Sequence, residues 1–390
     1  GDPLGLEQAR DRAKVVGDQP IGSVSADITT AFEGGSFVDG AYAGGTRDNR
    51  AAQSTLGNLV ADSLVATLSD PLRGGAEIGV VNPGGLRAEL LRGDDGVITF
   101  AEANAVLPFV NNLWTTTLTG EQFTQVLEEQ WQTNADGSIP SRPYLALGLS
   151  KNVTYTYDAD APQGSHITGV WIDGKPIDPN GSYRIGSFNF LLTGGDNFRT
   201  FTQGTDTRDS GLIDRDAWIS YLTANSPVSP SYATRSAEVT GLPGTVEAGS
   251  QVSFQVSGLN LTSLGSPETT SLLVSIEGSQ SVLDPIGVVD GSATVAFTVP
   301  ADAPAASTIV IQAPETGTEL RLPLTVTGGS TGGGTDTPPT TTPQPVDPSQ
   351  LIPALQDLIK VITGELRAGS TITIHVGTQY AGDWVTVWLY

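Results

Sequence analysis

The sequence predicts an α+β domain followed by an all-β region. Over residues 1–237, apolar residues at helical spacing are interspersed with short strand-like runs, without the regular repeat of a βαβ fold. From about Glu238 to Gly328 the pattern changes, and apolar residues alternate with polar ones at a period of two. A Gly/Pro/Thr-rich stretch then separates residues 350–390. We therefore expect domains at 1–237 and 238–327, a linker at 328–349, and a further module at 350–390.

The elements of the first domain follow from apolar spacing and from helix-start signals. Thr99 with Glu102, and Thr119 with Gln122, have the spacing of capping boxes, in which two side chains satisfy the first amides of a helix. Helices are predicted at Leu6–Val16, Gln53–Leu68, Ala103–Leu107, from Thr119 to about Trp131, and at Asp214–Leu222. Strands are predicted at Ile78–Val81, Val153–Tyr157, Gly169–Ile172 and Tyr183–Phe190.

The second region has the features of a sandwich. Val252, Phe254 and Val256 alternate with polar neighbours, and Asp290-Gly291 is a hairpin-turn signal. Short strands and turns over this length predict an immunoglobulin-like fold. After the linker, Leu351 to Ile362 predicts one amphipathic helix. Strands are expected at Thr371–Val376 and Trp384–Leu389, and this last stretch is too short to complete another sandwich, so we expect a truncated β module.

Composition excludes several classes of function. The chain has 390 residues, 19 basic against 42 acidic, and a net charge of −23, which disfavours generic nucleic-acid binding. No apolar run approaches the roughly 20 residues of a membrane-spanning helix. The sequence opens without a signal peptide and contains no Met, so we expect a mature or excised part of an exported protein, secreted or at the cell surface.

No catalytic or metal-binding residues can be assigned. There is no Cys, and the two histidines are His166 and His375. Too few imidazoles and no thiolates remain for a zinc or iron site, and no GxSxG motif seats a nucleophilic serine. We interpret His166 as a turn histidine and His375 as a solvent-facing strand residue. The acid-rich turns lack the spacing of a calcium-binding EF-hand.

Several loops carry side chains suited to a ligand. In Asn82-Pro83-Gly84-Gly85-Leu86-Arg87, adjacent glycines allow close backbone approach and the guanidinium suits phosphate or carboxylate. Arg47 and Arg50 precede a predicted helix, a place that favours an anion. The alternative for each is a surface turn with a solvated arginine.

Aromatic residues in two other loops extend this set. LPFVNN contains Phe109 and Asn111 ahead of a strand, and FNFLLTGGDNF contains Phe188, Phe190 and Phe198 around a Gly194-Gly195-Asp196 turn. Rings can stack on a base, a carboxylate can accept ribose hydroxyls, and guanidinium can meet phosphate. Phenylalanines are more often part of a core than of a site, so each motif alone is weak.

Five motifs in order resemble the C-terminal domain of the 5′-nucleotidase family: STLGNLVADSL, NPGGLR, GVITFAEANAVLPFVN, LTGEQFTQVLE and FNFLLTGGDNF. The resemblance covers about residues 1–237 and implies a fold of that type, acting in nucleotide catabolism. It implies that Phe109 and Phe190 sandwich the base, and that Asp196 takes the ribose hydroxyls. Further roles are implied for four residues: phosphate or neighbouring ligand oxygens for Arg50 and Arg87, and polar contacts near the base for Asn82 and Asn111. A role for Arg47 does not follow, because its spacing from Arg50 does not clearly match.

The resemblance also implies a partner. In this family a separate N-terminal metallophosphatase domain carries a divalent metal pair, and its DxH and GNHE-type motifs are not found here. The helix Leu6–Val16 would be the connection to that domain. We therefore expect this chain to need no cofactor of its own, to bind a nucleoside or nucleotide weakly, and to hydrolyse nothing alone. Two alternatives stay open: a cell-surface or adhesion stalk protein that uses the domain as a scaffold, and the specificity domain of an extracellular nuclease.

Overall fold

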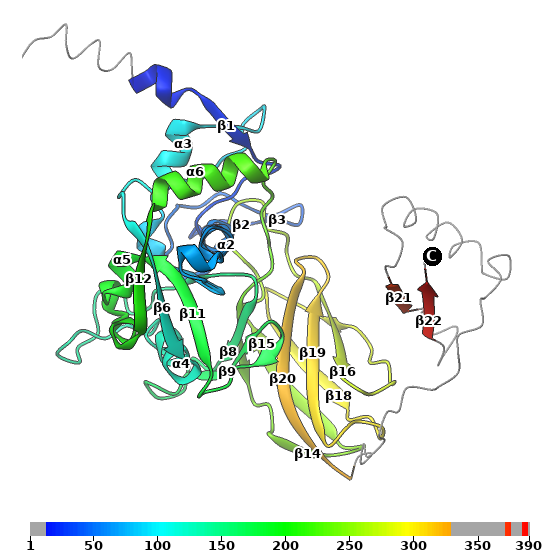
Figure 1. Cartoon of the computed structure of the whole chain (residues 1–390). Helices are drawn as coiled ribbons and strands as arrows, with labels where there is room; N and C mark the ends of the chain where they lie inside the picture. The colour runs from blue at the N-terminus through cyan, green and yellow to red at the C-terminus, as the bar shows by residue number, and fades with distance from the viewer. Residues whose placement is uncertain (1–12, 329–370, 376–383, 389–390) are drawn as a thin grey trace, which may run out of the picture. The chain divides into compact units, whose positions relative to one another are not determined.

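The computed structural model describes residues 13–328, together with the backbone of residues 371–375 and 384–388 (Figure 1). The chain divides into two compact units, residues 1–332 and residues 333–390. In the second unit, β21 (Thr371–His375) and β22 (Trp384–Trp388) pair antiparallel at the two places where strands are predicted. The predicted helix from Leu351 to Ile362 lies outside the described residues. The first unit contains all the remaining elements.

A five-stranded sheet forms the centre of the α+β region, in the order β12-β6-β11-β4-β7. β11 pairs parallel with β4, and the other neighbours pair antiparallel. β4 carries the run IGVV, which is buried at all four positions, as in a strand covered on both faces. The strands are β4 (Ile78–Val81), β6 (Asn112–Thr119), β7 (Gly148–Leu149), β11 (Ser182–Phe188) and β12 (Thr205–Ile213).

Helices cover both faces of this sheet (Figure 1). On one face α2, α3 and α6 pack around a core that includes Leu56, Val106 and Trp218. On the other face α4 contributes Phe123 and Leu127 to a second core. Within the described residues no helix is long and apolar enough to cross a bilayer. The helices are α2 (Thr55–Leu68), α3 (Phe100–Val106), α4 (Gly120–Glu128), the single turn α5 (Asn189–Leu192) and α6 (Asp214–Asn225); residues 13–17 are also helical.

The helix starts follow the predicted capping signals. Thr99 accepts from the amide of Glu102, whose side chain accepts from the amide of Thr99, and Thr119 and Gln122 repeat this reciprocal arrangement. Ser54 caps α2 by accepting from Gly57 N at 3.0 Å. Both predicted capping boxes are therefore present, and in each the threonine is the residue directly before the helix.

A six-stranded sheet crosses from the α+β region into the all-β region, in the order β10-β9-β8-β13-β15-β18. β13 pairs parallel with β8 on one side and antiparallel with β15 on the other. The predicted domain boundary at 237/238 falls inside β13, so the two regions share one continuous sheet. The strands are β8 (Val153–Tyr157), β9 (Ile167–Ile172), β10 (Lys175–Pro176), β13 (Ser236–Thr240), β15 (Gln251–Ser257) and β18 (Ala293–Thr298).

A second all-β sheet, in the order β14-β20-β19-β16-β17, faces β13, β15 and β18 across a core that includes Phe254, Val295 and Leu322. We call residues 236–327 the β-sandwich region. Asp290 and Gly291 form the predicted turn, with φ of 51° and 68° and with Val289 bridged to Ser292. Many folds share this two-sheet packing, so the immunoglobulin-like assignment stays a prediction. The strands are β14 (Thr245–Glu247), β16 (Ser271–Ile276), β17 (Ile286–Gly287), β19 (Ala306–Ala313) and β20 (Thr318–Thr327).

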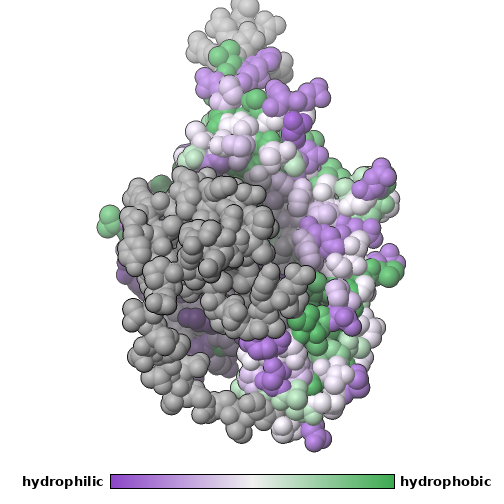
Figure 2. Space-filling model, turned by 90° about the vertical axis from the view of Figure 1, so that its right-hand side faces the viewer, coloured by the Kyte–Doolittle hydropathy of each residue, from purple (hydrophilic) through white to green (hydrophobic). Residues whose placement is uncertain are grey.

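Short elements complete the first unit. Two small ribbons pair β1 (Pro20–Ser23) with β5 (Val97–Thr99), and β2 (Ser36–Val38) with β3 (Ala41–Ala43). Single 3-10 turns are η1 (Pro71–Arg73), η2 (Pro83–Gly85), η3 (Gly195–Asn197) and η4 (Arg199–Gln203). In the coloured part of Figure 2, hydrophilic and hydrophobic residues are interspersed rather than gathered into one apolar face.

Candidate functional site: a pocket between two exposed phenylalanines

A pocket of about 370 Å³ lies where the loops after β4, before β6 and after β11 meet, beside the loop that precedes α2. This volume lies within the usual range for small-molecule sites. We call it the Phe109–Phe190 pocket. Six of the seven predicted ligand-binding residues line it, and Arg87 is the exception. The lining residues are Arg50, Asn82, Gly84, Gly85, Phe109, Asn111, Phe188, Phe190 and Asp196.

The turn η2 forms one wall, and its sequence explains its shape. Asn82, buried at the end of β4, donates from Nδ2 to Asp196 Oδ2 at 2.6 Å. A Cβ on Gly84 would lie 3.0 Å from Arg50 Nη1 and 3.5 Å from Asp196 Oδ2. A Cβ on Gly85 would lie 3.2 Å from Asn82 Oδ1, a buried acceptor without a partner among the described residues. The two glycines therefore leave room for the arginine, the carboxylate and the amide to converge.

Two phenylalanines line the pocket, and much of each side chain is exposed to solvent. Phe109 is 57% exposed and Phe190 is 45% exposed, whereas Phe188 and Phe198 are buried in the core. Phe109 is followed by Val110 with φ of 59°, a conformation that costs a β-branched residue free energy. Exposed rings on a strained loop contribute little to folding, which favours a role in binding.

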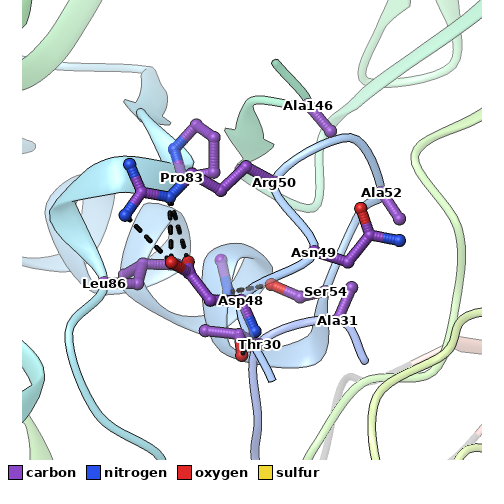
Figure 3. A pocket seen from close by; sticks show the side chains of 12 residues that line it. Thr30, Ala31, Asp48, Asn49, Arg50, Ala52, Ser54, Pro83, Leu86 and Ala146 are labelled. Atoms are coloured by element: carbon purple, nitrogen blue, oxygen red, sulfur yellow. Dashed lines mark hydrogen bonds and ion pairs between the residues drawn. The ribbon is translucent and has the colours of Figure 1, made fainter. Parts of the chain in front are cut away.

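Arg50 reaches the pocket from the loop before α2, and Asp48 holds it there (Figure 3). Arg50 Nε lies 3.1 Å from both carboxylate oxygens of Asp48, and Arg50 Nη2 lies 2.9 Å from Oδ2. This leaves Nη1 next to Gly84 and on the side of Asp196. Figure 3 shows the pair beside Pro83 in a smaller cavity that adjoins the pocket.

The other two arginines of the predicted set behave differently. Arg87 contacts two residues that line the pocket: its guanidinium carbon lies 5.7 Å from the centre of the Phe109 ring, a cation–π distance, and its Nη1 donates to Gly84 O at 3.4 Å. Arg47 donates from Nε to Glu89 Oε1 at 2.6 Å and lines neither cavity. Arg47 therefore forms a structural ion pair with Glu89.

Asn111 and Asp196 complete the polar lining. Asn111 Nδ2 donates to Asp214 Oδ2 at 2.9 Å, and the amide of Asp214 donates to Asn111 O at 2.9 Å. Burial raises the pKa of the Asp214 carboxyl, and hydrogen bonds that the carboxyl accepts from the Asn111 side chain and the Arg215 amide partly oppose the rise. Asp196 and Asn197 both have positive φ, at 52° and 63°, in the turn after Gly194. The lining of the pocket therefore offers one carboxylate, two amides, one guanidinium and two exposed aromatic rings.

Two further residues, Asp48 and Asp214, belong to the site although the sequence does not predict them. Each is the partner that orients a pocket residue. The available signals were weak: Asp48 stands two residues before Arg50, and Asp214 begins a predicted helix. An aspartate in either place is usual for a turn or a helix start, so neither pattern indicates a site.

The interpretation of His166 as a turn histidine needs correction. His166 directly precedes β9 and is buried, with its ring stacked on Trp131 at a centroid distance of 4.1 Å. Its Nδ1 lies 3.0 Å from Glu128 Oε2, and Glu128 Oε1 accepts from Ile167 N at 2.6 Å. A buried carboxylate needs such partners, which accounts for the position of the imidazole. The side chain of His375 lies outside the described residues.

Metal-binding side chains do not cluster in the described part of the chain: it contains no group of three or more His, Asp or Glu residues close enough to hold an ion. The Phe109–Phe190 pocket offers the single carboxylate of Asp196. The residues present therefore do not fit a metal pair.

Comparison with known proteins gives a consistent result for the α+β region. Residues 26–203 match the family model described as "5'-nucleotidase, C-terminal domain". The chain is 31% identical over 209 residues to the "Trifunctional nucleotide phosphoesterase protein YfkN" of Bacillus subtilis, covering 52% of this chain and 14% of that protein. It is 29% identical over 196 residues to "Protein UshA" of Escherichia coli, covering 50% of this chain and 32% of that protein.

Two further similarities complete the comparison. The "NAD 5'-nucleotidase" of Haemophilus influenzae is 29% identical over 206 residues, with 48% of this chain and 32% of that protein covered. Among solved structures, a 5′-nucleotidase precursor from Thermus thermophilus aligns with a TM-score of 0.48 and 24% identity, over 61% of this chain and 43% of that one. The chain thus spans about a third or less of the length of these three curated relatives.

Proposed function

Residues 26–203 form a 5′-nucleotidase C-terminal domain, and from this premise we propose that the chain is the substrate-binding part of an exported 5′-nucleotidase-like phosphohydrolase. In this proposal the Phe109–Phe190 pocket holds the nucleoside of a nucleotide. Hydrolysis takes place at a metal domain that does not belong to these residues. The described residues do not fit a metal pair, so no chemical step is assigned to them.

The single observation that carries the proposal is the meeting of Phe109, Phe190 and Asp196 in one cavity from two distant segments of the chain. A planar base can lie between exposed rings, and stacking on aromatic side chains is worth about 1–3 kcal/mol per base. Asp196 already accepts from Asn82, and its remaining lone pairs suit the hydroxyls of a ribose. A pocket of about 370 Å³ has room for a base and a sugar.

Calorimetric titration of the chain with adenosine and with AMP tests the proposal. We expect weak binding in the parent chain, and a loss of about tenfold or more in Phe109→Ala and in Phe190→Ala. Phe37→Ala is the matched control, because Phe37 packs on Tyr42 in a separate ribbon and does not line the pocket. This variant should bind as the parent does.

Two results would contradict the proposal. Absence of any binding by the parent chain would favour the alternative in which the domain is a scaffold on a cell-surface stalk. Metal-dependent release of phosphate from AMP by the pure chain would show that hydrolysis does not need another domain.

A further inference from the structure

A further cavity, of about 150 Å³, lies at the junction of the α+β region and the β-sandwich region. Its walls come from the loop before α2, the segment before β7, the end of β8, the start of β13 and the loop after β15. We call it the Tyr144–Tyr157 cavity. Ala52 and Ala146, labelled in Figure 3, line both this cavity and the smaller one beside Arg50. Among the described residues it shares none with the lining of the Phe109–Phe190 pocket, so it is a separate cavity.

Two tyrosines form an aromatic wall of the cavity. Their rings both pack edge-on against Trp131, with centroid distances of 4.9 Å for Tyr144 and 5.5 Å for Tyr157. Trp131 is in turn stacked on the buried His166, so the tyrosine rings rest on a packed aromatic cluster. Rings held in this way favour contact with another aromatic ring. A cavity of about 150 Å³ holds a molecule about as large as benzene, so size and wall together select a single ring.

The polar groups of the lining have donors to spare. Ser236 is 3% exposed and accepts from Gln53 Nε2 at 2.5 Å, while its own hydroxyl hydrogen reaches no acceptor among the described residues. Asn260 Oδ1 accepts from the amide of Thr269 at 2.9 Å, and Asn260 Nδ2 donates to no residue that the structure describes. The Tyr157 hydroxyl has no partner in the described part of the chain either, and burial raises the pKa of Tyr157, which keeps its proton in place. Donors without partners favour a ligand that carries an acceptor.

The lining of the cavity is also uncharged. Within residues 13–328 no Asp, Glu, Lys or Arg lines it. Two charged neighbours of the lining residues have partners of their own: Glu238 accepts from Ser257 Oγ at 2.8 Å, and Arg235 Nε donates to Leu149 O at 3.2 Å. A carboxylate or a phosphate would therefore lose its water without gaining a cation, which is far more costly than the burial of a neutral polar group.

We propose that the Tyr144–Tyr157 cavity is a second small-molecule site, which takes a neutral compound with one aromatic ring and a carbonyl acceptor. The ring lies against the two tyrosines, and the carbonyl oxygen accepts from the Tyr157 hydroxyl and from Asn260 Nδ2. This inference goes beyond the proposed function and does not depend on it, because the two cavities have different linings.

Ligand-observed NMR titration of the chain with three probes of similar size tests the proposal. Benzamide has the ring and the acceptor, toluene lacks the acceptor, and benzoate adds a charge. We expect benzamide to bind with a dissociation constant of about 1 mM, as suits so small a ligand. Toluene should bind at least about threefold more weakly and benzoate at least about tenfold more weakly.

Two variants place the probe in the cavity. Tyr157→Phe should weaken benzamide about three- to tenfold, because it removes one donor, and it should unfold at the same urea concentration as the parent. Asn260→Asp should weaken benzamide by at least about threefold, since it keeps an acceptor for Thr269 and replaces the free donor by an acceptor. Tyr221→Phe is the matched control for Tyr157→Phe and should change nothing, because the Tyr221 hydroxyl also has no partner among the described residues and does not line the cavity.

Three results would overturn the inference. Absence of benzamide binding at up to about 20 mM would show that the cavity does not admit a ring. Benzoate that binds as tightly as benzamide would show that charge does not select the ligand. Loss of benzamide binding in Phe109→Ala without any loss in Tyr157→Phe would place the probe in the Phe109–Phe190 pocket. The probe series on the parent chain needs no variant, and none of these results decides whether adenosine binds, so the proposed function is tested separately.

Discussion

The β-sandwich region and the α+β region differ in where their backbone is strained. Among the described residues, non-glycine positions with positive φ occur once in the β-sandwich region, at Asp290, where a two-residue turn requires it. The α+β region has seven: Asp39, Asp48, Val110, Asp173, Asp196, Asn197 and Asp206. Four of them are in the loops that form the Phe109–Phe190 pocket and its Arg50–Asp48 wall. Regular strand pairing builds the sandwich, whereas the pocket depends on conformations that regular pairing excludes.

The largest expected effect is on stability, and it distinguishes a phenylalanine of the sandwich core from a phenylalanine of the pocket. Phe254→Ala in the sandwich core should lower the free energy of unfolding by about 3–5 kcal/mol, because a fully buried ring leaves a cavity. Phe190→Ala should cost less than about 1 kcal/mol, since its ring is 45% exposed. Urea denaturation followed by circular dichroism measures both. Similar losses in the two variants would mean that the rings of the pocket are part of the core.

The next effect concerns the junction between the two regions. Arg235 is buried directly before the β-sandwich region, donates from Nε to Leu149 O at 3.2 Å, and places Nη2 3.6 Å from Asp62 Oδ2. Arg235→Met should cost about 2–3 kcal/mol, because it leaves the partly buried Asp62 without its cation. Arg321→Met, which removes the surface pairs with Glu277 and Glu319, is the control and should cost less than about 1 kcal/mol.

Tryptophan fluorescence of a chain with Trp384 and Trp388 changed to Phe sharpens the test at the junction, because the other four tryptophans all precede residue 236. Circular dichroism reports both regions. In Arg235→Met the two signals should change at the same urea concentration if the shared sheet keeps the regions cooperative. Separate transitions would show that the continuous sheet does not couple them.

A smaller effect is expected from one added methyl group. Gly84→Ala should weaken adenosine binding about tenfold, because its Cβ would lie 3.0 Å from Arg50 Nη1. The free energy of unfolding should change by less than about 0.5 kcal/mol, since the contacted atoms are the ends of side chains. Gly287→Ala in the sandwich, where no atom lies within 4 Å of the new Cβ, should change neither quantity. Unchanged binding by Gly84→Ala would indicate that ligands do not reach this wall.

The smallest expected effects are changes in stability with pH, and they have opposite signs at Asp214 and Asp302. Burial raises the pKa of Asp214, so its folded form binds protons more readily and stability rises as the pH falls through the raised value toward 3.8. Hydrogen bonds from Ser279 and the amide of Gln280 lower the pKa of Asp302. Its contribution to stability is therefore fully present above pH 3.8 and is lost as the pH falls through the lowered pKa.

Asp214→Asn should therefore cost more stability at pH 4 than at pH 7, and Asp302→Asn should cost more at pH 7 than at pH 3. Both differences should stay below about 1 kcal/mol, because hydrogen bonds oppose the effect of burial at Asp214 and solvent screens Asp302. Thermal melts at the three pH values measure them. The same pH trend in both variants would contradict the assigned causes.

The regular elements could be predicted because local patterns determine them. β4 matches its predicted bounds, the capping boxes precede α3 and α4, and β15 and β18 follow the period of two. The edge strand β12, TDTRDSGLI, could not be predicted, because it has no apolar alternation and depends on pairing with β6.

The pairing of strands that are far apart in the sequence could not be predicted either. Parallel pairing of β13 with β8 joins residues about 80 positions apart, and no local pattern encodes it. Loop chemistry gave a wider set of candidates, the resemblance to the family reduced it to seven residues, and the structure brings six of these together. The hydrogen-bonding partner of each pocket residue could not be predicted, because an arginine such as Arg50 could pair with many different carboxylates in a chain this acidic. Whether these residues bind a nucleotide stays a prediction.

The loop before α2 connects the Phe109–Phe190 pocket to the β-sandwich region within a few residues. At one end Arg50 faces the pocket, and three residues later Gln53 donates to Ser236 Oγ at 2.5 Å and accepts from the amide of Arg235 at 2.7 Å. Three residues of chain therefore separate the side chain that lines the pocket from the side chain that is hydrogen-bonded to the first strand of the β-sandwich region. We expect substitutions that shift β13 to change the position of Arg50 as well.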